Sequence, residues 1–214
     1  MKTRLFAALL VLCAVSLGAQ APATAPGALA HPTEFGFSYS LPTDWDVKDM
    51  GPAVPLLHQQ LEKRADSEGE KKATNCVQIP LLATHGTPRS VIEVVTLAYD
   101  CFGQQFADTD LPAFAVGVAG GLTKTFTIDG PIYGAYTLGA HSVWIERATG
   151  TSIAHPELKS TLETVCTLLS KAAVCWMAIV SDDSALQVFE HGSVTFTGEA
   201  PVALVSAEAF NKKP

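Results

Sequence analysis

The stretch TLETVCTLLSKAAVCWMAIVS, residues 161–181, decides the fold that we expect for this chain. With Ser170-Lys171 as a two-residue turn, it forms a β-hairpin in which Val165 faces Trp176 and Cys166 faces Cys175. Both faces of the hairpin are mostly apolar, which is typical of strands in the middle of a sheet that is covered on both sides. One face carries Leu162, Thr164, Cys166, Leu168, Cys175, Met177 and Ile179, and the other carries Val165, Leu169, Val174, Trp176, Ala178 and Val180.

The first half of this stretch has a helical alternative. Pro156-Glu157 suits a first helical turn, and apolar residues recur at helical spacing at Leu158, Leu162, Val165, Cys166 and Leu169. A helix would leave the opposed cysteines unexplained, and it disagrees with the β-branched residues Thr161, Thr164, Val165 and Thr167. We favour the hairpin.

Composition indicates one globular domain. The chain has 214 residues, of which 48% are hydrophobic and 16% are charged, and this composition suffices for a sizeable core. The formal net charge of −7 disfavours nucleic acid and anionic membranes as partners, because both attract basic surfaces.

The N-terminus has the pattern of a secretory signal peptide, residues 1–21. A basic start, MKTR, precedes an apolar run from Leu5 to Leu17, and small residues stand at Ala19 and Ala21. We expect cleavage after Ala21 and a flexible leader over residues 22–33; an uncleaved anchor is the alternative. Cleavage removes two basic and no acidic residues, so the formal charge changes from −7 to −9. No later stretch is long and apolar enough to span a bilayer, and the mature protein is expected to be soluble and periplasmic or extracellular.

Export changes the meaning of the cysteines. The mature chain keeps four, Cys76, Cys101, Cys166 and Cys175, and an even number in an oxidising compartment indicates two disulfides with three possible connectivities. Opposed positions in the hairpin favour Cys166–Cys175, which leaves Cys76 to pair with Cys101. Four free thiols are the alternative. Neither spacing is CxxC, and redox catalysis is therefore disfavoured.

The remaining pattern predicts a single α+β domain over residues 34–206 and a fraying tail over residues 207–214. Helices are expected at 52–65, 111–122 and 184–190, and the charged run EKRADSEGEKK (62–72) is expected to be a solvated loop. Strands are expected at 35–40, 46–48, 75–83, 90–99, 123–129, 132–138, 140–147, 193–197 and 201–206. A turn is expected at 129–131 and a loop at 149–156.

The segment FSYSLPTDWDV, Phe37–Val47, resembles the opening of PsbP/Mog1-like domains. CWMAIVSDDSALQVFEHGSVTF, residues 175–196, is similar to uncharacterised exported proteins of soil bacteria. The resemblance implies a central antiparallel sheet with helices on both faces, an α/β/α sandwich. It also implies membership of a group that contains binding and assembly factors and shares no catalytic residue. The four cysteines and the charged run depart from the pattern.

No motif points to a defined chemistry. His58 and Glu62 are four residues apart, but two ligands are too few to specify a metal. Cys101 with Asp100 and His85 would make a nucleophile site, although a cysteine in an exported protein is more often bridged. The glycines Gly117, Gly120 and Gly121 lie inside or after a helix rather than before one, so they do not form a phosphate loop. His191 suits the end of a helix. We expect no metal and no cofactor.

Two classes of function remain. We favour a non-enzymatic exported module that binds a protein or small ligand at the cell envelope. The alternative is a small extracytoplasmic hydrolase, and it requires at least two of His85, Asp100, His141 and His155 to meet in a pocket.

Overall fold

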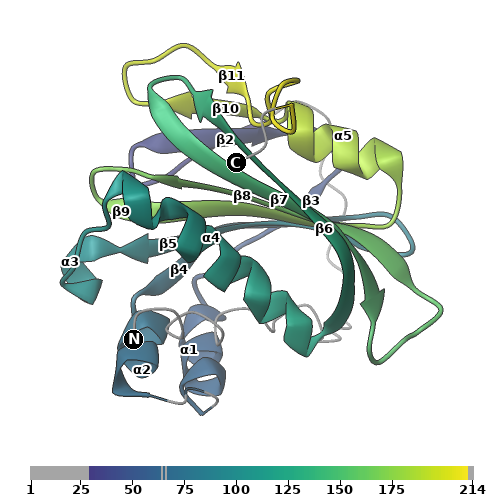
Figure 1. The fold of residues 1–214 in the computed structure, drawn as a ribbon, viewed down its shortest axis with the longest axis horizontal. Coiled ribbons are helices and arrows are strands. Elements are labelled where there is room, and N and C mark those ends of the chain that lie inside the picture. The colour runs from purple at the N-terminus through teal and green to yellow at the C-terminus, as the bar shows by residue number, and fades with distance from the viewer. Residues whose placement is uncertain (1–28, 64, 66, 212–214) are drawn as a thin grey trace.

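A computed structural model describes residues 29–211, except residues 64 and 66. The expected signal peptide, its cleavage site and most of the expected leader lie outside these residues. The described chain is an α+β protein with a seven-stranded antiparallel sheet, a four-stranded sheet and five α-helices (Figure 1).

The seven-stranded sheet is the centre of the fold. Its strand order is β3-β4-β5-β9-β8-β7-β6, and every pairing is antiparallel. The strands are β3 (Asp46–Lys48), β4 (Val77–His85), β5 (Ser90–Ala98), β6 (Phe126–Leu138), β7 (His141–Ser152), β8 (Lys159–Leu168) and β9 (Ala172–Val180).

The expected hairpin is confirmed as β8 and β9. Val165 faces Trp176 and Cys166 faces Cys175, while the amide of Leu169 donates to the carbonyl of Ala172 at 2.9 Å. The hairpin occupies the middle of the sheet, and every residue of β9 is buried. The helical alternative for the first half is wrong, since that segment pairs with β7 on one side and β9 on the other.

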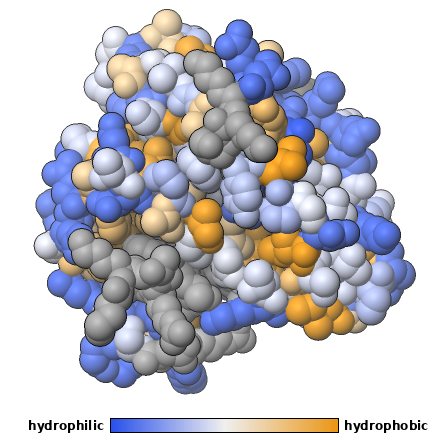
Figure 2. Space-filling view, viewed as in Figure 1, coloured by the Kyte–Doolittle hydropathy of each residue, from blue (hydrophilic) through white to orange (hydrophobic). Residues whose placement is uncertain are grey.

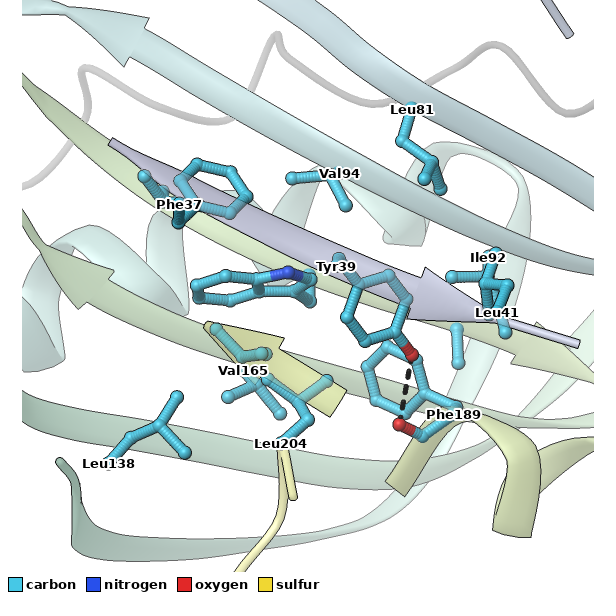
Figure 3. Packing of buried hydrophobic residues seen from close by; sticks show 14 of the residues in the cluster. Phe37, Tyr39, Leu41, Leu81, Ile92, Val94, Leu138, Val165, Phe189 and Leu204 are labelled. Atoms are coloured by element: carbon cyan, nitrogen blue, oxygen red, sulfur yellow. Dashed lines mark hydrogen bonds between the residues drawn. The ribbon is translucent and has the colours of Figure 1, made fainter. Parts of the chain in front are cut away.

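One face of the large sheet is covered by a second sheet. This four-stranded sheet has the order β1-β2-β10-β11 and consists of β1 (Leu29–Pro32), β2 (Phe37–Leu41), β10 (Ser193–Phe196) and β11 (Val202–Ala203). Helix α5 (Asp183–His191) lies beside it. Residues from both sheets and α5 form one core, in which the ring of Phe37 meets that of Trp176 edge-on at a centroid distance of 5.2 Å. Figure 3 shows Tyr39 reaching across this core to donate its hydroxyl to the carbonyl of Phe189, at 3.0 Å.

The other face is covered by helices. Helix α4 (Leu111–Gly120) crosses it and buries Phe114 and Val118 against the Cys166–Cys175 disulfide and its neighbours. Helices α1 (Val54–Glu62) and α2 (Glu68–Asn75) lie side by side next to β4, and α3 (Tyr99–Phe102) follows β5. An expected helix therefore covers this face, but the second sheet on the opposite face is a correction to the expected arrangement of helices on both faces.

Several expected boundaries were wrong. The charged run at 62–72 contains the start of α2, because the hydroxyl of Ser67 accepts from the amide of Glu70 at 3.2 Å and caps the helix. The turn expected at 129–131 is a bulge within one long strand, β6. Strand β7 extends into the loop expected at 149–156 and ends at Ser152.

Both ends of the domain extend further than expected. Residues 29–32 of the expected leader form β1 and pair with β2. The described part of the expected fraying tail, residues 207–211, packs on the core instead, since Ala209 is 1% exposed and the guanidinium of Arg147 lies 4.6 Å from the centroid of the Phe210 ring. The described part of the domain therefore reaches at least to residue 210.

Candidate ligand-binding cleft

An open cleft of ≈ 590 Å³ lies at the β3–β4 edge of the large sheet. It is bordered by the β1–β2 turn, the segment after β3, one side of α1, the start of β4 and the Cys76–Cys101 disulfide. The residues that line it are Pro32, Thr33, Glu34, Phe35, Lys48, Asp49, Met50, Gly51, Val54, His58, Asn75, Cys76, Gln78, Ile79, Pro80 and Cys101. The lining mixes apolar, amide and charged side chains, as in sites that bind by shape and hydrogen bonding.

The cleft lies beside an unpaired length of strand. Strand β3 pairs only with Leu82, Ala83 and Thr84 of β4, although β4 begins at Val77. Among the described strands, none pairs with the outer edge of residues 77–81. The chain leaves β3 through Asp49–Gly51 instead of continuing along β4, and this departure opens the space beside it.

The pairing pattern shows which backbone groups face the cleft. The amide of Ala98 donates to the carbonyl of Cys76 at 3.3 Å, so these two residues form a hydrogen-bonded pair. Antiparallel pairing alternates, and the backbone groups of Val77 and Ile79 therefore point to the outer edge. The carbonyl of Val77 accepts from Nε2 of His58 at 2.7 Å. No hydrogen bond within the described chain satisfies the outer backbone groups of Ile79.

One disulfide and one hydrogen bond hold this edge in place. The Cys76–Cys101 disulfide joins the residue before β4 to α3, with the two Cα atoms 5.4 Å apart. His58 holds α1 against β4, and because a carbonyl only accepts, its Nε2 carries the proton. The side chain of Ile79 packs beneath α1 with Leu57 and Leu61. The cleft therefore has a floor and one wall that are fixed before any ligand binds.

The charge at the rim of the cleft is acidic. Lys48 forms an ion pair with Asp46, and Asp49 accepts from the amide of Gly51 at 2.9 Å. Glu34 is exposed and has no ion pair within the described chain. With Lys48 neutralised by its neighbour, the carboxylates of Glu34 and Asp49 determine the local sign.

A row of mostly polar side chains, interrupted by Met177, crosses the helix-covered face of the sheet away from the cleft. In register, Tyr133, Glu146, Thr164, Met177 and Glu93 are successive cross-strand neighbours. Desolvation by burial raises the pKa of Glu93 to about 7 and that of Glu146 to about 7. These carboxyls lie in a packed layer, and they make the stability of the fold depend on pH.

The opposite face contains a charged cluster that closes the core. Arg147 donates through Nε to Glu163 and through a terminal nitrogen to Glu190. Burial raises the pKa of Glu163 to about 7, and the hydrogen bond from Arg147 opposes that shift. Tyr136 donates its hydroxyl to the carbonyl of Leu204 at 2.6 Å. The cluster fixes α5 and the C-terminal segment on the sheet.

The four residues proposed for a hydrolase do not meet. Each histidine instead contacts a different carboxylate. Nε2 of His85 lies 3.2 Å from Asp44 and Nε2 of His141 lies 3.4 Å from Glu199. Nδ1 of His155 lies 3.3 Å from Glu157. The strands that carry His85 and His141 are separated by three others, a distance of about 19 Å. Asp100 and His85 lie at opposite ends of the β4–β5 hairpin. The structure therefore does not bring His85 together with His141 or Asp100, and none of the four residues lines the cleft.

The other chemical candidates have structural contacts. Cys101 is bridged to Cys76, so it is not a nucleophile. His58 donates to Val77, and Glu62 accepts from Asn75 at 3.2 Å. No group of histidine, cysteine and acidic side chains suited to a metal ion occurs among the residues that the structure describes. Gly117 and Gly120 lie within α4, and His191 lies in the last turn of α5.

The cleft is not visible in the sequence, because its lining comes from segments far apart in the chain. One signal was present. Proline within a strand is confined to edges and bulges, and Pro80 stands in the middle of β4 beside a register shift between Gln78 and Leu81. This residue marks the edge at which the cleft lies.

No helix within residues 29–211, with 64 and 66 left aside, combines the length and hydrophobicity needed to cross a bilayer. Figure 2 shows the hydrophobic side chains of one face in separate patches among polar ones.

Comparisons with solved structures include a distant likeness. No protein-family model matches the chain, and no curated protein matches it. The chain is similar in structure to LpqN, which is involved in cell envelope biogenesis of Mycobacterium tuberculosis. The TM-score is 0.41 and the sequence identity is 14%, over 81% of this chain and 91% of that chain.

Proposed function

We propose that this protein is an exported, non-enzymatic binding module of the cell envelope and that its ligand occupies the cleft beside β4. The observation that carries the proposal is the open volume of ≈ 590 Å³ next to an unpaired strand edge. The edge is held by a disulfide and by the His58–Val77 hydrogen bond. A site with a fixed wall loses little entropy on binding, which favours recognition.

The compartment is supported by the covalent structure. Both disulfides, Cys76–Cys101 and Cys166–Cys175, join the pairs expected from the sequence, and disulfides persist in oxidising compartments. The signal-peptide pattern of residues 1–21 agrees with export. The PsbP/Mog1-like resemblance of Phe37–Val47 agrees with a binding role, since that group contains binding and assembly factors.

A cleft-filling variant tests the proposal. Gln78 lines the cleft and is partly exposed on β4, so Gln78→Trp places an indole in the space and suits a strand. Thr84→Trp is the matched control, because Thr84 lies on the same strand and outside the lining of the cleft.

Mature protein, both variants and a blank resin would be used to capture proteins and small molecules from envelope extract, with identification by mass spectrometry. We expect the native chain and Thr84→Trp to retain a common ligand that Gln78→Trp loses. Retention of the same ligands by Gln78→Trp would show that the cleft is not the binding site.

A further inference from the structure

We infer that the cleft binds an extended polypeptide segment carrying lysine or arginine, which adds as a strand to the outer edge of β4. This inference rests on the proposed function and names the class of ligand. The first ground is the backbone of Ile79, whose N–H and C=O point to the outer edge and have no hydrogen-bond partner in the described chain. An unpaired strand edge is a template for another strand.

The length of the free edge sets the length of the segment. Residues 77–81 precede the part of β4 that β3 occupies, and five residues of strand extend about 16 Å. His58 already donates to Val77 from the side on which a new strand would lie. The added strand therefore pairs with Ile79 and meets β3 at its far end, which limits pairing to about five residues.

Proline restricts the way in which the edge can pair. Pro80 has no amide hydrogen, and the register shift between Gln78 and Leu81 interrupts the ladder at the same point. These features oppose continuous pairing of two identical edges. The edge therefore favours a short incoming segment over a second copy of this chain.

Charge selects the side chains of the segment. Glu34 and Asp49 stand at the rim, while Lys48 is paired with Asp46. Glu34 belongs to the β1–β2 turn and Asp49 follows β3, so the carboxylates flank the edge from two separate elements. A segment with a basic residue near one of its ends would place that residue against them.

The test uses defined peptides and the mature, disulfide-bonded protein. The probe is a blocked hexapeptide of alternating valine and threonine with lysine at each end. A second peptide carries glutamate in place of lysine, and a third keeps the lysines but is N-methylated at every internal amide, so that neither edge can donate. Binding is followed by NMR through the amide of Ile79 and its hydrogen exchange.

The expected results separate strand addition from simple charge attraction. The lysine peptide is expected to slow exchange of the Ile79 amide and to shift the resonances of Gln78 and Ile79. The N-methylated peptide is expected to lose these effects, and the glutamate peptide is expected to bind about tenfold more weakly. Equal binding of the lysine and N-methylated peptides, or an unchanged Ile79 amide, would overturn the inference.

Paired variants test the charge argument. The double variant Glu34→Lys with Asp49→Lys is expected to bind the lysine peptide about tenfold more weakly. The control pair is Asp129→Lys with Glu157→Lys, which makes the same change in net charge. These exposed residues lie in β6, the opposite edge strand, and in the β7–β8 loop, and the change is expected to leave peptide binding unchanged. Equal effects of the two pairs would refute selection by the rim. If the peptides fail while Gln78→Trp still abolishes ligand capture, the cleft remains the site and strand addition is wrong.

Discussion

Glu93 is expected to make the protein less stable as the pH rises, and Glu93→Gln is expected to remove that dependence. The residue lies on the interior strand β5, is 5% exposed, and has Leu82 and Met177 as cross-strand neighbours. A protonated carboxyl is buried at small cost, whereas the charged form loses its hydration. The folded state therefore keeps the proton to a higher pH than the unfolded state does.

The magnitude follows from the two pKa values. Burial raises the pKa of Glu93 from 4.5 to about 7, and each pKa unit corresponds to about 1.4 kcal/mol. The native chain therefore loses about 3 kcal/mol of unfolding free energy through this residue. The stability is fully present below the unfolded pKa and is lost as the pH rises through the folded pKa. Glu146 and Glu163 have the same direction of shift, so the variant removes only one contribution.

Urea unfolding of native protein and Glu93→Gln at a series of pH values from about 5 to about 9 measures the effect. The comparison is the slope with pH, because the buried amide has its own cost that does not change with pH. Glu157→Gln is the control, since the Glu157 side chain is 67% exposed. Parallel pH profiles for native protein and Glu93→Gln would refute the assignment.

Three further results are expected. Denatured mature protein should give no reaction with a thiol reagent before reduction and four thiols after it; two or more thiols before reduction would contradict the two bridges. Arg147→Met leaves the carboxylate of Glu163, 0% exposed, without its partner and should cost about 3–5 kcal/mol in urea unfolding. Arg147→Met with Glu163→Met should recover much of that loss, and an equally unstable double variant would argue against the ion pair as the cause. A Cβ at Gly134 would lie 1.9 Å from the carbonyl oxygen of Ala209, so Gly134→Ala should speed proteolysis of the C-terminal segment, whereas Gly120→Ala, with nothing within 4 Å, should not.

The hairpin of β8 and β9 was predictable because its pattern is local. Its turn, its opposed cysteines and its two apolar faces all lie within residues 161–181. The strands Phe37–Leu41 and Ser193–Phe196 were also expected, but their pairing was not. Alternation identifies a strand and does not identify its partner when that partner is more than 150 residues away, and for this reason the second sheet was missed.

Helix α2 shows a signal that the sequence contained. Ser67 and Glu70 have the spacing of a capping box, and Ser67 does cap the helix. The dense charge of the segment concealed it, since a charged run also suits a loop. The cleft could not be predicted in the same way. Its shape depends on where β3 stops pairing with β4, and a tertiary contact decides that point.

The origin of the four-stranded sheet determines when the protein can finish folding. Strands β1 and β2 come from the start of the described chain, and β10 and β11 come from residues 193–203. The seven-stranded sheet is complete at Val180, before β10 and β11 of the covering sheet have been synthesised. Until β10 emerges, the face that carries Trp176 has β1 and β2 available but lacks β10 and β11, so only part of its cover exists. A chain truncated before Ser193 would keep a complete large sheet with one apolar face only partly covered, and is expected to aggregate rather than remain a smaller folded domain.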